Sequence, residues 1–336
     1  INWKQYSINE LKKIKNQAIQ LNKHEQQITK QNIELKKQIN KFKYEIGKIN
    51  WDNVLKVGYP KTNPDESKFN IYKNKAGKEV KVTDEYQYLE DNDNDNTKQW
   101  IKSQVSLCNN YLSMCNDRDK IYDDLENNIN FPRYSTPHKR GKGNNKANIF
   151  TYTYNTGLQN QSVLYYIKGD SDPFKCSEAI ELIDPNKLSD DGTVSLGGTY
   201  YSYDAKYLCY GLKRSGSDWV EFQVKNIETG KDEMDLIKWC KFTGISWTPD
   251  NKGFFYCRYN PPKKFQDAKD DDFKRGTETE QLKNQQLFYH VLGTKQEDDI
   301  FLIDAVMLGD KEYMIGTEIS DDDNYLMVYI SKDCDP

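Results

Sequence analysis

The first fifty residues carry one apolar stripe among polar positions. Its members recur at alternating steps of three and four, the a and d spacing of a coiled-coil heptad. Two polar residues, Glu25 and Asn32, interrupt the stripe. We predict a helical extension over 1–50 whose seam at 11–49 self-associates; the alternatives are a lone amphipathic extension and a wrongly joined gene segment. The seam comprises Leu11, Ile14, Ala18, Leu21, Glu25, Ile28, Asn32, Leu35, Ile39, Phe42, Ile46 and Ile49.

A second pattern covers residues 51–132. Residues 51–70 hold Pro60 and Pro64 and predict an extended connector. The stretch FNIYKNKAGKEVKV follows, in which two alternating runs flank Ala76-Gly77, so we predict a hairpin with its turn there.

Helical spacing then appears twice. The first predicted helix begins with Asn96 or Thr97 as its N-cap, and a second covers about 117–127. The acidic run DNDNDN (91–96) precedes the first helix, but an EF-hand loop needs glycine at its sixth and glutamate at its twelfth position. Asn96 and Lys102 stand there, so we predict a solvated, negatively charged helix N-terminus and no calcium site.

From about residue 148 the pattern is that of short strands in a repeat. Three segments each read as strand, Ser/Thr-x-Asp turn and aromatic-rich strand, and the first two turns are about 46 residues apart, as in propeller blades. A second hairpin follows two of them. We predict a mainly β fold with an incomplete seven-bladed β-propeller over 133–336, holding about one and a half hairpins of a first blade, two full blades and the opening hairpin of a fourth. The three segments are 197–212, 242–259 and 315–331.

Two stretches interrupt the repeat without breaking it. The charged segment 261–284 has few apolar residues and predicts a surface loop. The stretch YNTGLQNQSVLYYI (154–167) reads as a strand, a turn and a strand of the first blade.

Charge and cysteine usage restrict the class of protein. The net charge is −4, from 48 basic and 52 acidic residues, so we expect neither nucleic acid nor a membrane surface as a partner. The chain has no apolar run long enough to span a membrane and no signal-peptide pattern. Its seven cysteines are scattered and odd in number, which favours reduced thiols and a cytoplasmic location. Because the chain begins at Ile1 and stops in CDP after a strand-like run, we expect a fragment.

Catalytic motifs are absent from the 336 residues. No G-x-S-x-G is present, and in RSGSDW (214–219) we interpret Ser215 and Ser217 as turn residues. His24 lies in the heptad segment, His138 in a basic loop (138–146) and His290 in the middle of a strand, where packing is the simpler interpretation. Neither zinc spacing nor a phosphate-binding loop occurs, so we expect no metal site and no cofactor.

Several long motifs closely resemble the prolyl oligopeptidase family, also called prolyl endopeptidases. The resemblance covers roughly residues 57–336, in the family's order, and leaves 1–50 outside. The motifs are YLEDNDNDNTKQWIKSQ (88–104), FPRYSTP (131–137), YNTGLQNQSVLY (154–165), IDPNKLSDDGTVSL (183–196), YGLKRSGSDWV (210–220), SWTPDNKGFFY (246–256), LFYHVLGTKQEDDI (287–300) and EISDDDNYL (318–326).

The resemblance implies a two-domain serine peptidase that cleaves short peptides after proline. In the family, a seven-bladed propeller caps an α/β-hydrolase domain that carries the Ser/Asp/His triad, and the segment corresponding to 51–132 packs on the hydrolase. We therefore expect proline-containing short peptides and a C-terminal α/β-hydrolase domain as partners, no catalytic residue in this chain, and no activity of residues 1–336 alone.

Three positions match propeller residues that line a substrate pocket in the family. They are Phe255, Met314 and Cys334, whose aromatic, thioether and thiol groups would form an apolar, adaptable wall. The alternative for Phe255 and Met314 is ordinary blade core.

The sequence departs from the family in two places. Ser331 stands where the family usually has an arginine, which removes an ionic contact. Upstream, Glu85 and Tyr88 stand where the family has proline and tryptophan, so we expect the local packing there to differ. A different class of function stays open, namely a non-catalytic propeller that binds partners and self-associates through 11–49.

Overall fold

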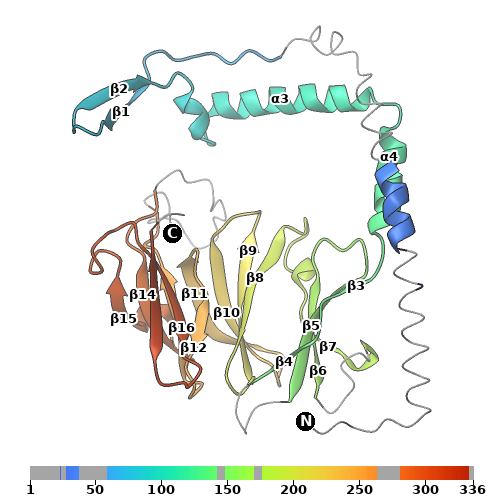
Figure 1. Cartoon of the computed structure of the whole chain (residues 1–336), viewed down its shortest axis with the longest axis vertical. Coiled ribbons are helices and arrows are strands. Elements are labelled where there is room, and N and C mark those ends of the chain that lie inside the picture. Colours follow the sequence, from blue (N-terminus) through green and yellow to red (C-terminus); the bar gives the residue numbers. More distant parts are fainter. Residues whose placement is uncertain are drawn as a thin grey trace. The chain divides into compact units, whose positions relative to one another are not determined.

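The computed structural model describes residue 23 and residues 28–37, 59–141, 148–169, 176–262 and 281–332. The chain divides into two compact units, Ile1–Asp65 with Lys98–Cys115, and Glu66–Thr97 with Asn116–Pro336. Figure 1 shows the elements and their order along the chain. Across the described ranges, no helix combines the length and apolar character that crossing a membrane requires.

The smaller unit is helical over much of its described part. Residues 28–37 form a helix with exposed side chains, as the heptad pattern predicts; apart from residue 23, the rest of the 11–49 seam lies outside the described residues. Helix α3 (Asp95–Ser113) supplies most of the unit's second segment. Its Trp100 Nε1 donates a hydrogen bond to Thr62 Oγ1 over 2.8 Å, which ties the connector to the helix.

The start of α3 differs from the sequence prediction. Asn94, not Asn96 or Thr97, is the cap, because its Oδ1 accepts a hydrogen bond from the Asn96 backbone amide at 2.9 Å. Thr97 is instead buried and donates its hydroxyl hydrogen to the Tyr88 carbonyl in the 3₁₀ turn η1 (Gln87–Glu90). In the acidic run, Asp91 Oδ1 accepts a hydrogen bond from the Asp93 backbone amide, as the side chain of an Asx turn does.

Two elements of the larger unit precede its blades. Strands β1 (Phe69–Lys73) and β2 (Glu79–Thr83) form the predicted hairpin, in which Asn74 Oδ1 accepts hydrogen bonds from the Ala76 and Lys78 amides. Gly77 has a φ of 76°, a conformation that glycine adopts without strain. Helix α4 (Arg118–Ile129) begins one residue after the predicted start and ends two residues after the predicted end.

Three complete antiparallel blades and the first hairpin of a fourth follow (Figure 1), which confirms the incomplete β-propeller. Neighbouring strands follow chain order in the second and third blades, and in the first from β5 onward. The first blade holds β3 (Arg133–Tyr134), β4 (His138–Arg140), β5 (Ile149–Asn155), β6 (Val163–Lys168) and β7 (Ile180–Ile183). The second holds β8 (Val194–Tyr201), β9 (Tyr207–Arg214), β10 (Val220–Asn226) and β11 (Asp232–Cys240). The third holds β12 (Ile245–Trp247), β13 (Gly253–Arg258), β14 (Gln286–Val291) and β15 (Ile300–Asp304), and the fourth starts with β16 (Met314–Ile319) and β17 (Leu326–Ser331).

The first blade is more complete than the sequence predicted. Both β3 and β4 pair with β5, so the first strand position is filled. His138 therefore lies in a strand and not in a loop. The prediction failed because His138, Lys139 and Arg140 show no apolar alternation; their strand conformation comes from pairing with Ile149, Phe150 and Thr151.

The core lies between the blades. Alternate residues of one strand enter different clusters: Leu208, Tyr210 and Leu212 of β9 pack between the first and second blades, while Cys209 packs between the second and third. The same division in β13 places Phe254 and Tyr256 in the second cluster and Cys257 in a third, with Leu287 and Ile315. This alternation follows from the two-residue period of a strand that is covered on both faces.

The three Ser/Thr-x-Asp turns share one set of hydrogen bonds. The hydroxyl of the first residue donates to the Asp carboxylate, over 2.7 Å at Ser202, 2.7 Å at Thr248 and 2.6 Å at Ser320. The residue after the Asp has a positive φ, which is 53°, 58° and 62° in the three turns. Its backbone amide donates a hydrogen bond to the carbonyl of the Ser or Thr that begins the turn. The repeat seen in the sequence is thus a repeat of turn geometry. The residues with positive φ are Ala205, Asn251 and Asp323.

These turns also connect blades. The Asn251 side chain of the third blade accepts a hydrogen bond from the Asp204 amide of the second at 3.0 Å. Farther along, Ser246 Oγ of β12 donates to the Thr317 carbonyl of β16 at 2.8 Å. Strand β12 contacts both β8 and β16, so the first strands of three successive blades lie next to one another.

The YNTGLQNQSVLYYI stretch forms the end of β5, a turn and β6. Asn155 Oδ1 accepts from the Gly157 amide, and Asn155 Nδ2 donates to the Gln159 carbonyl. A Cβ on Gly157 would stand 2.4 Å from Asn130 Oδ1, so the turn needs glycine to lie against the end of α4. Arg133 completes the junction with a 2.8 Å hydrogen bond to the Gly157 carbonyl.

Candidate functional site

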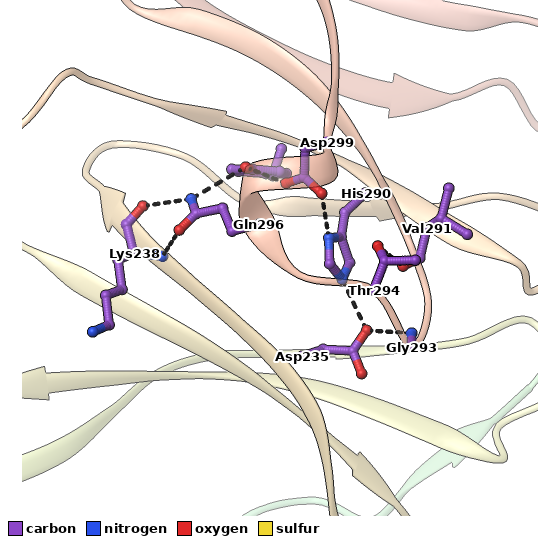
Figure 2. Close-up of polar contacts among 9 residues, drawn as sticks. Asp235, Lys238, His290, Val291, Gly293, Thr294, Gln296 and Asp299 are labelled. Carbon is purple, nitrogen blue, oxygen red and sulfur yellow. Dashed lines mark hydrogen bonds and ion pairs between the residues drawn. The ribbon is translucent and has the colours of Figure 1, made fainter.

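The most concentrated set of titratable groups surrounds His290. This residue lies on β14, and both its ring nitrogens contact carboxylates: Nε2 is 2.8 Å from Asp235 Oδ1, and Nδ1 is 2.6 Å from Asp299 Oδ1 (Figure 2). Asp235 belongs to β11 of the second blade, whereas Asp299 follows the 3₁₀ turn η5 (Gln296–Asp298) of the third. The three side chains are fully shielded from solvent.

A second layer of hydrogen bonds fixes the two carboxylates. The Gly293 amide donates to Asp235 Oδ1 over 2.7 Å, and the Tyr256 hydroxyl donates to Asp299 Oδ2 over 2.6 Å. Gln296 Nε2 donates to the Tyr256 hydroxyl and to the Lys238 carbonyl, while Gln296 Oε1 accepts from the Lys238 amide. Figure 2 shows that the network runs from the β11 backbone through the turn after β14.

The electrostatics of this network do not suit proton transfer at neutral pH. Burial by itself would lower the pKa of His290, but hydrogen bonds to Asp235 and Asp299 and their charges outweigh it and raise the pKa to about 9. The imidazole is then protonated, donates from both nitrogens and has no lone pair to accept a proton. His290 is therefore a packed strand residue that joins two blades, as the simpler interpretation of the sequence predicts.

Nearby thiols are also unsuited to nucleophilic chemistry. Cys209, Cys240 and Cys257 are buried, and burial is the main cause that raises the pKa of each thiol, in Cys257 to about 12. Only the thiolate is a strong nucleophile, and here it is disfavoured. Within the described residues, no group of three or more His, Cys, Asp or Glu side chains is arranged to hold a metal ion.

The serine-containing stretch RSGSDW (214–219) forms a turn between β9 and β10. Ser215 has a φ of 50°, Gly216 has a φ of 74°, and the Ser217 amide donates to the Arg214 carbonyl. Strand β10, not a helix, follows. Ser215 and Ser217 are thus turn residues, as predicted.

Of the predicted pocket residues, Phe255 lies on β13 and is half-buried. It packs against the cluster of Cys257, Leu287 and Ile315 at the junction of the third and fourth blades, and its ring centroid is 5.1 Å from that of Tyr289. Phe255 is therefore partly accessible to solvent. This is consistent with a role in a pocket wall and equally with a position at the edge of a blade core.

Met314 begins β16 and is also half-buried. Its strand partner is Ser331, the residue that replaces the family's usual arginine. Since neighbouring residues of a strand point to opposite faces, Met314 faces away from the cluster that Ile315 shares with Phe255. The structure thus brings β13 and β16 together but places Phe255 and Met314 on different sides of β16, and Cys334 lies outside the described residues.

The family model described as "Prolyl oligopeptidase, N-terminal beta-propeller domain" matches residues 60–336. Prolyl endopeptidase of Dictyostelium discoideum is 31% identical over 83% of this chain and 40% of its own length. Prolyl endopeptidase of Elizabethkingia meningoseptica is 33% identical over 74% of this chain and 32% of its own length. This chain therefore spans about two fifths or less of the length of these relatives.

Solved structures agree with the sequence matches. Prolyl oligopeptidase B from Galerina marginata, bound to a 25mer macrocyclization substrate, superposes with a TM-score of 0.67 at 28% identity, over 82% of this chain and 38% of that one. The matched domain is the propeller, and the described residues form antiparallel blades and helices without an α/β-hydrolase domain. On these grounds, the chain belongs to the prolyl oligopeptidase family and carries its N-terminal β-propeller domain.

Proposed function

We propose that this chain is the propeller portion of a serine endopeptidase that cleaves short peptides after proline, and that the propeller limits access by substrate size. The observation that carries the proposal is the match of residues 60–336 to the family's propeller domain. The acyl-transfer chemistry is assigned to a triad and an oxyanion hole in a C-terminal α/β-hydrolase domain, the partner of this propeller.

Contacts between blades support the size-limiting role. A filter that excludes large substrates must resist separation of its blades, and three contacts oppose separation here. His290 joins the third blade to Asp235 of the second, Asn251 bonds the Asp204 amide, and Ser246 bonds β16. We also expect a cytoplasmic location, since Cys108, Cys115, Cys209, Cys240 and Cys257 are free thiols.

Hydrolysis of fluorogenic peptides tests the proposal. Protein purified from the natural coding sequence should cleave a short peptide with proline before the leaving group and should not cleave the matched peptide with alanine there. Activity should fall steeply as the peptide is lengthened at both ends, because the propeller then excludes it. Residues 1–336 alone should cleave neither peptide. Equal cleavage of the proline and alanine peptides, or no dependence on length, would contradict the proposal.

We propose that Phe255, Met314 and Cys334 contact the substrate residue two positions before the proline. Because Phe255 and Met314 lie on different sides of β16, they would do so from separate surfaces. Phe255 has an accessible part of its ring in support of this role, and the other two assignments rest on the family motif alone. Phe255→Ala should lower kcat/KM about tenfold for a peptide with an apolar residue two positions before the proline. The loss should be much smaller for a matched peptide with glycine at that position. An equal loss for both peptides would indicate a packing role instead.

A non-catalytic function is the second candidate, and it is favoured by one feature of the helix at 28–37. Ile28 and Leu35, both in the predicted seam, are 46% and 50% exposed and so are available to a second copy of the helix. In that case the protein should dimerise and should not cleave the proline peptide, and Leu35→Lys should abolish dimerisation. Sedimentation equilibrium measures the first effect, and a monomeric wild-type protein would remove this candidate.

A further inference from the structure

A cavity of about 250 Å³ lies between the first and second blades. Residues of β4, β5 and β6 line one side and residues of β8 line the other, so the cavity lies beside the first strands of both blades. Figure 1 shows where these strands lie. The side chains that decide its chemistry are His138, Arg140, Thr151, Thr153, Leu196 and Thr199. None of the lining residues is acidic.

Strand register explains why two basic side chains face this cavity. His138 pairs with Thr151 and Arg140 pairs with Ile149, and directly paired residues share one face of a sheet. Ile149 belongs to the apolar cluster between the first two blades, so His138 and Arg140 point toward the second blade. Lys139 points to the other face, where its Nζ lies 5.9 Å from the Phe150 ring centroid.

Arg140 is held in place by a hydrogen bond and a ring contact, and no ion pair joins it to a described residue. Its Nε donates to Thr151 Oγ1 over 2.7 Å, and its guanidinium carbon lies 4.4 Å from the ring centroid of Tyr201 on β8. Arg140 is half-buried, and its contacts with described residues are to a hydroxyl and an aromatic ring rather than to a carboxylate. A partly desolvated guanidinium beside an open cavity favours an anion there, and its planar fork matches a carboxylate.

The remaining surface of the cavity suits the end of a peptide. The hydroxyls of Thr153 and Thr199 provide hydrogen-bond donors, while Leu164 and Leu196 provide apolar walls for a side chain. We propose that this cavity binds the C-terminal carboxylate of a short peptide, with Arg140 as the charged anchor. The inference rests on the proposed function, which makes short peptides the abundant ligands of this protein.

Isothermal titration calorimetry at low salt tests the inference directly. The probes are N-acetyl-Ala-Leu as the free acid and as its amide, which lack proline and so avoid a proline-specific catalytic pocket. The protein is purified from its natural coding sequence. The acid should bind about tenfold or more tightly than the amide, because only the acid pairs with the guanidinium.

Substitutions at two neighbouring basic residues distinguish binding in the cavity from attraction to the general surface charge. Arg140→Gln should reduce the affinity for the acid about tenfold or more and leave the amide unaffected, whereas Lys139→Gln, on the other face, should change neither. Circular dichroism verifies that each variant is folded. The comparison of acid with amide uses the wild-type protein and does not depend on either variant.

Three results would overturn the inference: equal affinity for acid and amide, unchanged affinity in a folded Arg140→Gln protein, or inorganic phosphate binding as tightly as the peptide acid. The last would indicate a general anion site. Peptide hydrolysis reports separately on the proposed function. Proline-specific cleavage without carboxylate binding would remove only this inference, while carboxylate binding without cleavage would remove only the proposed peptidase activity.

Discussion

His290 Nε2 lies 2.8 Å from Asp235 Oδ1, and this contact joins a strand of the third blade to a strand of the second. The opposite ring nitrogen contacts Asp299 of its own blade at 2.6 Å. Both side chains of the inter-blade pair are fully shielded from solvent. A buried pair of this kind is strongly destabilising when one partner is removed, because the other charge stays buried alone.

The raised pKa of His290 predicts how stability depends on pH. The folded-state pKa of about 9 exceeds the ordinary histidine pKa of about 6.5, so folding favours the protonated imidazole. Its stabilisation is fully present below about pH 6.5 and is lost as the pH rises through about 9, by an amount on the order of 3 kcal/mol. Urea denaturation across this range should show unfolding free energy falling with pH.

His290→Gln provides the control for that pH dependence. The variant should be less stable than wild type by about 3 kcal/mol near neutral pH and should lack the alkaline decline. If the variant keeps the wild-type slope, another group titrates and the assignment to His290 is wrong.

Replacing the first serine by alanine should lower the unfolding free energy by different amounts in two of the repeated turns. Ser202 is buried, donates to Asp204 and accepts from the Tyr207 amide at 3.0 Å, so Ser202→Ala removes both hydrogen bonds where water cannot replace them. We expect a loss of about 2 kcal/mol. Ser320 makes the same bonds where solvent has access, so Ser320→Ala should cost under about 1 kcal/mol. Equal losses in thermal or urea unfolding would contradict this explanation.

Two glycines form a matched pair for a packing prediction. A Cβ on Gly253 would stand 2.1 Å from the His290 carbonyl oxygen, a backbone atom that can move only with its strand. Gly253→Ala should therefore destabilise the protein by about 2 kcal/mol or more. A Cβ on Gly316 would meet only Tyr329 Cβ, at 3.8 Å, so Gly316→Ala should change the unfolding free energy by well under about 1 kcal/mol. Comparable unfolding midpoints would show that β13 and β14 adjust freely.

Burial of the thiols predicts selective alkylation. Cys108 and Cys115 are exposed and should react with iodoacetamide in the native protein. Cys209, Cys240 and Cys257 are buried with raised pKa values, so they should react only after unfolding. Peptide mass spectrometry identifies the modified cysteines. Rapid native labelling of Cys209 would show that the second and third blades separate in solution.

Sequence reasoning succeeded where short-range pattern decides structure. The hairpin turn at Gly77 and the three Ser/Thr-x-Asp turns depend on neighbouring residues, and each was predicted. It failed at β4, where three polar residues become a strand only because β5 offers a pairing edge. It also placed the N-cap of α3 at Asn96 or Thr97, whereas the structure has it at Asn94.

Side-chain contacts between distant parts of the chain could not be predicted from the sequence. Nothing in the sequence pairs His290 with Asp235, since 55 positions separate them and no motif contains both. Arg140 likewise gives no signal, because its position in a run of basic residues resembles that of a solvated side chain. Phe255, Met314 and Cys334 were assigned through the family motifs, and their role in substrate binding remains a prediction.

The sequence by itself determined the blade repeat, the turn chemistry and the family, because period-two alternation and Ser/Thr-x-Asp turns are local properties of the chain. The tertiary structure alone decided which faces of neighbouring blades meet. That arrangement buries His290 between two carboxylates and leaves Arg140 beside a cavity, with no carboxylate of the described residues paired to it. Both outcomes depend on contacts between residues far apart in the chain, where desolvation and charge pairing, rather than local propensity, set the chemistry.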